Sequence, residues 1–272
     1  MRTATRQFVD MAGDGERLPH LPALDGLRGL AVAGVLAFHA GLDVMVGGYL
    51  GVSTFFTLSG YLITSLLLRR ADTGVDVPAF WRKRIRRLLP ASLVTIAAVL
   101  VVFTPFVATA SQRDSVRGDS LASLLNVANW WYLLADDSYG ALFVDPSPLL
   151  HFWSLAIEEQ FYLLFPLLLI GLWAVTGGRR KGIVVGLGSL TAVTVALPFV
   201  FAMSEDRVYF GTDTRAPELL LGALLAVGVR MAAVPGEQIG RRDAARQVLA
   251  RHVEVPVAAR AVGQHHGVVR RE

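Results

Sequence analysis

The sequence predicts an all-α protein, a polytopic bundle of about six transmembrane helices. Of its 272 residues, 53% are hydrophobic and 18% are charged, and the mean hydropathy is +0.49. This composition is more apolar than that of an ordinary soluble domain. Several apolar runs reach the ~20 residues that a helix needs to cross a bilayer, and basic residues gather in alternate connections between them. Together these observations indicate that the surrounding solvent is lipid.

The predicted spans are six apolar runs, at residues 27–46, 49–68, 88–107, 149–175, 183–203 and 216–233. We expect residues 21–233 to form one transmembrane domain, because no repeat or linker divides them. Residues 1–20 mix Arg, Asp and Glu without an apolar core, which predicts a cytoplasmic N-terminal segment rather than a signal peptide. Residues 234–272 are basic and lack aromatic side chains, which predicts a disordered or weakly helical cytoplasmic tail. The aromatic stretch 121–135 fits an interfacial or re-entrant helix, or an ordinary aromatic belt.

The distribution of basic residues predicts which connections lie in the cytoplasm. Under the positive-inside rule, Lys and Arg concentrate on the cytoplasmic side of a membrane. Three alternate segments carry most of them, and the intervening connections carry few. We therefore expect a multi-pass protein of the cell (plasma or inner) membrane with a cytoplasmic N-terminus. The basic residues of these three segments are Arg2, Arg6, Arg17, Arg69, Arg70, Arg82, Lys83, Arg84, Arg86, Arg87, Arg179, Arg180 and Lys181.

Several function classes are excluded by missing residues or motifs. The chain contains no cysteine, which excludes a thiol nucleophile, a disulfide framework and a zinc-thiolate site. It has no Gly-x-Ser-x-Gly elbow, no Walker-type phosphate loop and no His-Glu-x-x-His pattern, so the hydrolase, NTPase and zinc-protease classes are not favoured. We expect no metal site. The pI near 9.7 follows from the cytoplasmic basic residues, so no nucleic-acid partner is expected.

Arg28 and His39 are the first candidates for chemistry, because ionisable groups within lipid spans are costly unless they serve a function. They are eleven positions apart, which is ~20° beyond three full helical turns, and His39 lies ~16 Å further along the axis. Both side chains are therefore predicted on one helix face. Histidine can act as a general base near neutral pH. A hydrogen bond between helices and a proton relay are the alternatives for His39.

A second candidate cluster opens the fourth predicted span with His151 and continues with Glu158, Glu159 and Gln160. Adjacent helical carboxylates are ~100° apart, so one of them is predicted to face the bundle while the other finds a different polar partner. If Glu158 and His39 lie at a similar depth in the membrane, the carboxylate could orient the imidazole and stabilise its charged form.

The run Arg-Lys-Arg-Ile-Arg-Arg at 82–87 precedes Pro90 and is predicted to lie in a cytoplasmic loop. Attraction to anionic lipid would explain it, at ~1 kcal/mol per basic residue. Alternatively, arginine forks bind phosphate bidentately, which suits a nucleotide-bearing acyl donor.

Small residues let helices approach closely, and four glycines of the second span are assigned this role: Gly47, Gly48, Gly51 and Gly60.

Five sequence segments, in order, resemble the acyltransferase-3 family of multi-spanning membrane acyltransferases. The resemblance covers residues 21 to about 226. The segments are LDGLRG at 24–29 followed by FH at 38–39, GGYLGV at 47–52 with SGYLI at 59–63, the basic segment at 84–90, WSLAIEEQFY at 153–162, and GTDTR at 211–215.

The resemblance implies transfer of an acyl group, often acetyl, from cytoplasmic acyl-CoA to a hydroxyl of a cell-envelope glycan or a lipid-linked acceptor. Acyl-CoA is then a donor substrate rather than a bound cofactor, and membrane lipids are the surrounding partners. By position, His39 is the implied base and pairs with Arg28, while Arg84 and Arg87 are implied to bind the donor phosphates. Glu158 and Glu159 join His39 and Arg28 as the implied catalytic residues, and the other polar site candidates are Asp25, Gln160 and Arg215.

The sequence departs from the family pattern in two ways. Ser53 stands where the family usually has an acidic residue, which is expected to alter local polar contacts. Family members usually have about ten spans, whereas this chain is expected to stop after about six and to end in the basic tail. Two alternatives to an enzyme therefore remain: a truncated, inactive membrane remnant, and a transporter or proton-relay protein that uses the same buried groups.

Overall fold

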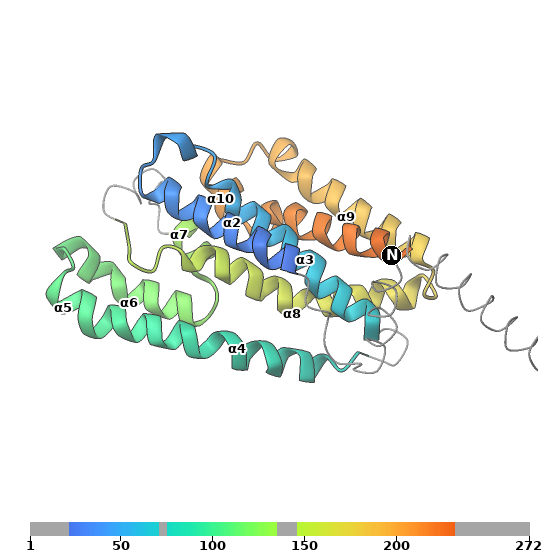
Figure 1. The fold of residues 1–272 in the computed structure, drawn as a ribbon, viewed down its shortest axis with the longest axis horizontal. Helices are drawn as coiled ribbons and strands as arrows, with labels where there is room; N and C mark the ends of the chain where they lie inside the picture. The colour runs from blue at the N-terminus through green and yellow to red at the C-terminus, as the bar shows by residue number, and fades with distance from the viewer. Residues whose placement is uncertain (1–21, 71–74, 135–145, 232–272) are drawn as a thin grey trace, which may run out of the picture. The chain divides into compact units, whose positions relative to one another are not determined.

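The computed structural model describes residues 22–70, 75–134 and 146–231, and within these ranges the regular structure is entirely helical (Figure 1). The all-α prediction is confirmed for this part of the chain. The chain divides into two units, residues 1–227 and 228–272. The first unit contains the helices described below, except for residues 228–231 at the end of the last one. The predicted N-terminal segment 1–20 and the tail 234–272 lie outside the described residues.

Helices α2 (Pro22–His39) and α3 (Leu50–Arg70) pack against each other, joined through the short helix η1 (Asp43–Met45). Their backbones come so close that a Cβ atom added to Gly51 would lie 2.5 Å from the Ala31 carbonyl oxygen. A Cβ atom on Gly48 would lie 2.8 Å from Phe38 Cβ. The prediction that glycines of the second span allow close helix packing is confirmed for these two positions and, below, for Gly60.

Helix α4 (Val77–Ala98) continues without a break through the π-helical turn η2 (Val99–Phe103) into α5 (Thr104–Phe106). Its start is fixed by Asp76, whose carboxylate accepts a hydrogen bond from Ala79 N at 2.9 Å, and by a proline in the first turn. The basic run 82–87 is therefore helical. The prediction that it lies in a loop is wrong, because a capped first turn allows charged residues to begin the same helix that later crosses lipid.

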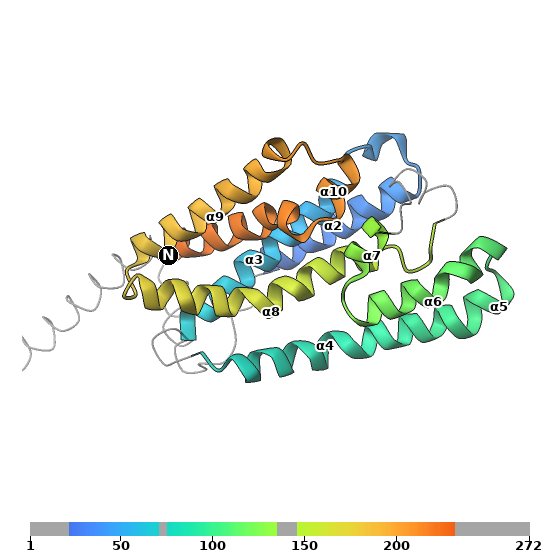
Figure 2. The ribbon, with the colours of Figure 1, turned by 180° about the vertical axis from the view of Figure 1, so that it is seen from behind.

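Helix α8 (Phe152–Val175) runs through the middle of the first unit and contacts α3, α4, α6 (Ala110–Leu124), α7 (Ala128–Leu134) and α9 (Arg180–Val200), as Figures 1 and 2 show. The short α10 (Glu205–Phe210) follows α9, and residues 212–231 form the last described helix. Buried Ile157, Phe165 and Leu169 of α8 belong to the core.

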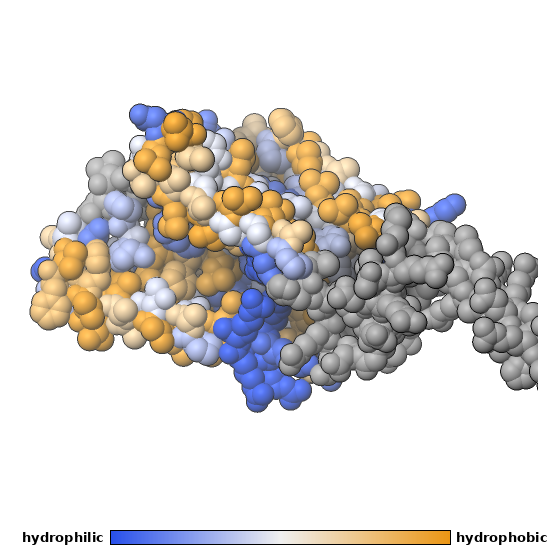
Figure 3. All heavy atoms as spheres, viewed as in Figure 1, coloured by the Kyte–Doolittle hydropathy of each residue, from blue (hydrophilic) through white to orange (hydrophobic). Residues whose placement is uncertain are grey.

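Four helical segments within the described residues are long and apolar enough to cross a membrane: Asp43–Arg69, Val77–Phe106, Phe152–Val175 and Arg180–Val200. Their outer surfaces carry exposed large apolar side chains, as lipid contact requires (Figure 3). Five of the six predicted spans lie largely within helices, whereas the first, 27–46, is α-helical only to His39 and continues through a turn into η1. The first and last predicted spans, α2 and 212–231, are not among the four segments. Helix α2 contains two charged residues, and residues 212–231 contain four.

Candidate active site

His39 ends helix α2, and its ring is oriented by the helix itself. His39 Nδ1 lies 2.8 Å from the carbonyl oxygen of Val35, one turn earlier. A carbonyl oxygen only accepts hydrogen bonds, so Nδ1 carries the proton and donates it. In the neutral ring, Nε2 then has a free lone pair. The side chain is exposed, so Nε2 is open to a substrate hydroxyl.

His151, directly before α8, is the side chain that the structure places against His39. The two ring centroids are 4.9 Å apart and the ring planes are nearly perpendicular, at 82°. Burial lowers the pKa of His151, and the nearby His39 lowers it further. The second imidazole therefore favours the neutral form.

Glu158 does not take the place beside His39 that was predicted for it. Its Oε1 accepts a hydrogen bond from Ser59 Oγ at 3.0 Å, and its Oε2 accepts one from Tyr162 OH at 2.7 Å. Seven residues separate Glu158 from His151, which is ~10 Å along the helix axis. The carboxylate therefore lies deeper along α8 than the histidine pair, where it links α8 to α3.

Two arginines, one from α2 and one from α4, act on this deeper carboxylate through their positive charge. The positive charges of Arg28 and Arg84 both act on Glu158, and Arg84 also acts on Glu159. The Arg84 guanidinium stacks over the Tyr162 ring, with its carbon 4.6 Å from the centroid. These residues form the inner cluster, defined here as Arg28, Ser59, Arg84, Glu158, Glu159 and Tyr162. Glu159 Oε1 is buried and has no hydrogen-bond partner among the described residues.

The predicted donor-binding arginines have different surroundings. Arg84 is half-buried in the inner cluster, whereas Arg87 is exposed. Together with its basic neighbours, Arg87 belongs to the hydrophilic patch on the first half of α4 (Figure 3). Trp81 fixes this half of α4 to α8, because its Nε1 donates to the Tyr162 carbonyl oxygen at 3.2 Å. That carbonyl lacks its usual helical donor, since Pro166 has no N–H.

Arg215 lies in the last helix, where its guanidinium packs over two aromatic rings. Its guanidinium carbon is 5.6 Å from the Trp153 ring centroid and 4.8 Å from that of Tyr209. Its Nη1 donates to Glu218 Oε1 at 2.8 Å, and Ser53 Oγ donates to the same oxygen at 2.9 Å. The sequence analysis missed Glu218, although a carboxylate within an apolar run is a candidate by default. Ser53, noted as a departure, takes part in this contact.

Gln160 holds the short helix α7 in place. Its Nε2 donates to Asn126 O at 2.8 Å and to Asn129 Oδ1 at 2.9 Å, and its Oε1 accepts from Thr212 Oγ1 at 2.5 Å. Asn129 is fully buried. The aromatic stretch 121–135 thus contributes a helix that packs against α8 through polar contacts, in addition to its aromatic side chains.

Two acidic residues lie near the starts of helices: Asp25, which was predicted as a site candidate, and Asp213, which was not. Asp25 is exposed in the first turn of α2. Asp213 forms a bidentate pair with Arg207, with both N–O distances at 2.7 Å. Hydrogen bonds from Arg207 hold the pKa of Asp213 below its ordinary value, and the positive charge of Arg207 adds to the effect. Within the part of the chain that the structure describes, no group of three or more His, Asp or Glu side chains is placed to hold a metal ion.

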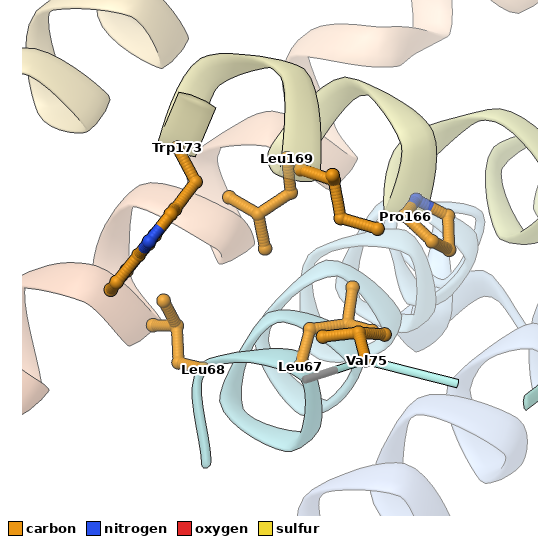
Figure 4. Close-up of a pocket in the computed structure, with 7 residues that line it drawn as sticks. Leu67, Leu68, Val75, Pro166, Leu169 and Trp173 are labelled. Atoms are coloured by element: carbon orange, nitrogen blue, oxygen red, sulfur yellow. The ribbon is translucent and has the colours of Figure 1, made fainter. Parts of the chain in front are cut away.

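An apolar pocket of about 230 Å³ lies between α3 and α8, further along α8 than the inner cluster (Figure 4). No charged side chain lines it, so it offers space but no acid, base or anion-binding group. Its lining residues are Leu67, Leu68, Val75, Pro166, Leu169, Ile170 and Trp173.

Comparison with known proteins identifies the family. The acyltransferase domain of the acyltransferase-3 type matches residues 21–231. The chain belongs to the acyltransferase-3 family. It is 44% identical over 211 residues to the peptidoglycan O-acetyltransferase OatA of Listeria monocytogenes, which covers 76% of this chain and 34% of that protein. It is 42% identical over 212 residues to a putative peptidoglycan O-acetyltransferase, YrhL, of Bacillus subtilis, which covers 76% and 33%.

A putative O-acetyltransferase of Staphylococcus aureus is 43% identical over 217 residues, covering 78% of this acyltransferase-3 chain and 35% of the relative. The chain therefore spans about one third of the length of these relatives. No solved structure matches the chain. The predicted family is confirmed, and the roles of the individual site residues stay predictions.

Proposed function

We propose that this chain is the membrane acyltransferase domain of an O-acetyltransferase that modifies a cell-envelope glycan such as peptidoglycan. The names of the relatives support the glycan acceptor and the acetyl group. The observation that supports this chemistry is the orientation of the His39 ring. Its Nδ1 is committed to the Val35 carbonyl, so Nε2 is an available base at an exposed position.

In the proposed reaction, His39 Nε2 takes the proton of the acceptor hydroxyl. The acceptor oxygen attacks the thioester carbonyl carbon of the donor, a C–O bond forms and the C–S bond breaks. The leaving thiolate then takes the proton from the His39 imidazolium, which restores the neutral ring. A positioned general base contributes ~10²- to 10⁴-fold to the rate, and holding donor and acceptor together contributes more.

Arg84 and Arg87 are the proposed contacts for the donor phosphates, since guanidinium groups match phosphate geometry. Their distance from His39 can be worked out from the spacing of residues along α8. Tyr162, under the Arg84 guanidinium, is eleven residues and ~16 Å along the axis from His151. Such a separation requires a donor with a long arm between its phosphates and its thioester, and coenzyme A has this form. The donor is a substrate, and no bound cofactor takes part.

The same geometry supports the proposed topology. The basic half of α4 and the histidine pair lie at different depths along α8, so one end of the domain can face a phosphate-bearing donor while the other faces an acceptor. With the N-terminus in the cytoplasm, the basic patch lies on the cytoplasmic side and His39 lies toward the outer side. Acyl-CoA then arrives from the cytoplasm and the glycan from outside.

The test is transfer of labelled acetyl from acetyl-CoA to envelope glycan in membranes that contain this chain. His39→Ala is expected to abolish label transfer. Leu30→Ala is the matched control, because Leu30 is on the same helix, is 72% exposed and lies on the opposite face from His39. Absence of transfer by the inserted wild-type chain would contradict the proposal and favour an inactive remnant. Solute flux without dependence on an acyl donor would favour a transporter.

A further inference from the structure

The pairing of His39 with His151 brings together two imidazoles that are 112 positions apart in the sequence, from the end of α2 and the start of α8. Two histidines in ring contact at an exposed end of a helical bundle are not needed for packing. His151 is held firmly by its neighbours, since Leu150 and Trp153 on either side are buried. Its ring therefore has a defined position beside the base.

The two rings differ in the hydrogen-bonding capacity that they leave open. The Nδ1 proton of His39 is already used, so its open nitrogen is an acceptor. Neither ring nitrogen of His151 has a hydrogen-bond partner among the described residues. Burial and the proximity of His39 favour the neutral form of His151, which carries one N–H. Among the described residues, the pair thus leaves one acceptor and one donor without a hydrogen-bond partner at the same place.

We propose that His151 is a second catalytic residue, whose neutral imidazole donates an N–H hydrogen bond to the thioester carbonyl oxygen while His39 takes the proton of the acceptor. This inference rests on the proposed acyl transfer. The attack places negative charge on the carbonyl oxygen, and a fixed donor aimed at that oxygen stabilises the transition state. A neutral imidazole acts in this way on carbonyl groups in other enzymes.

The assignment keeps the proton balance simple. The acceptor proton moves to His39 Nε2 and then to the leaving thiolate, whereas His151 keeps its own proton throughout. A neutral His151 is also required beside His39 at the moment when His39 becomes an imidazolium, because two adjacent positive charges would oppose that step. The contact between the rings therefore favours one base, His39, and one neutral hydrogen-bond donor, His151.

Two substitutions separate this role from packing. His151→Phe keeps an aromatic ring against His39 but removes the N–H donor, and it is expected to lower kcat by ~10²- to 10³-fold, the effect of losing one oxyanion donor. His151→Asn loses the ring but keeps an N–H donor, and it is expected to recover part of the lost rate. If His151→Phe turned over like the wild type, or if Asn were no better than Phe, the proposal would be wrong.

Binding to the chain in lipid nanodiscs gives a second readout that does not require turnover. Two coenzyme A analogues are compared, one with a ketone in place of the thioester and one with an S-ethyl group that lacks the carbonyl. His151→Phe is expected to weaken the ketone analogue at least tenfold and to leave the S-ethyl analogue unchanged, which also reports that the variant is folded. A His151→Leu variant provides the same comparison if the Phe variant does not fold.

The outcomes distinguish this inference from the proposed function. Equal binding of the ketone analogue by wild type and a folded His151→Phe or His151→Leu variant would overturn the role of His151 and leave the donor assignment intact. Failure of the wild-type chain to bind either analogue would overturn the donor assignment, and the role of His151 with it.

Discussion

Replacing Gly60 with alanine tests the packing that holds the last helix beside α3. A Cβ atom on Gly60 would lie 2.8 Å from Leu219 C and 3.1 Å from Leu219 Cα, and the Leu219 carbonyl oxygen is nearer still. These are backbone atoms, so they cannot rotate away and the helix itself must shift. Gly222 meets the backbone of α3 at the same crossing, since its added Cβ would lie 2.8 Å from Tyr61 N.

The magnitude follows from two opposing effects. Overpacking costs about 1–3 kcal/mol, and backbone atoms on the opposing side place Gly60→Ala near the upper end of that range. Alanine recovers at most ~1 kcal/mol through helix propensity. The expected net loss of folding free energy is therefore ~2 kcal/mol. For a domain of 150–250 residues this corresponds to a fall in Tm of about 4–8 °C.

The assay is thermal unfolding of the purified chain in one detergent, with Gly188→Ala as the matched control. Gly188 is also helical, in α9, but an added Cβ there meets no atom within 4 Å, so its Tm is expected to stay unchanged or rise. A Gly60→Ala protein as stable as the Gly188→Ala protein would refute the close crossing. The Gly60→Ala substitution is also expected to lower acyl transfer, because Leu219 adjoins the contact between Glu218 and Arg215.

Three further predictions concern α4, the donor contacts and acid stability. Trp81→Phe is expected to lower the unfolding free energy by about 1–3 kcal/mol, because it leaves a buried carbonyl unpaired. In a Pro166→Ala background, where that carbonyl regains its helical donor, the same change is expected to cost much less in a double-mutant cycle. In donor-binding measurements, Arg87→Gln is expected to weaken binding without changing Tm, whereas Arg84→Gln is expected to change both. The pKa of Asp213 is lower in the folded chain than in the unfolded chain. Its stabilising contribution is therefore fully present above pH ~3.9, the ordinary pKa of an aspartate in an unfolded chain. The contribution is lost as the pH falls through the lower pKa of the folded state. As the pH is lowered, the Tm of Asp213→Asn is therefore expected to fall less than the Tm of the wild type.

Much of the fold could be predicted from the sequence because apolar runs of membrane-spanning length have few alternatives to a helix. Five of the predicted spans are helical over nearly all of their described length, and the first is α-helical only to His39. Gly48, Gly51 and Gly60 allow the close contacts assigned to them. The start of α4 could not be predicted in this way. Helix formation does not require apolar residues, so the charged run 82–87 continues the helix beyond the lipid-facing part.

The site was harder to predict because its contacts are not local. Helical periodicity relates Arg28 to His39 within one helix, but it says nothing of how far α8 is shifted along α2. That shift places His151 beside His39 and leaves Glu158 with Ser59. The contact between Ser53 and Glu218 also joins residues from distant helices. Ionisable residues in apolar runs could be recognised as candidates, whereas their partners became visible only in the packed bundle.

The most direct test of the account is a kinetic comparison of wild type, His39→Gln and His39→Ala, each purified in lipid nanodiscs with acetyl-CoA and a soluble glycan acceptor. Initial rates of acetyl ester formation are measured at saturating donor. The account predicts that both variants bind the donor as the wild type does but lose at least ~10²-fold in kcat, since neither retains a base. A His39→Gln protein with wild-type kcat would contradict the assignment of His39 as the general base.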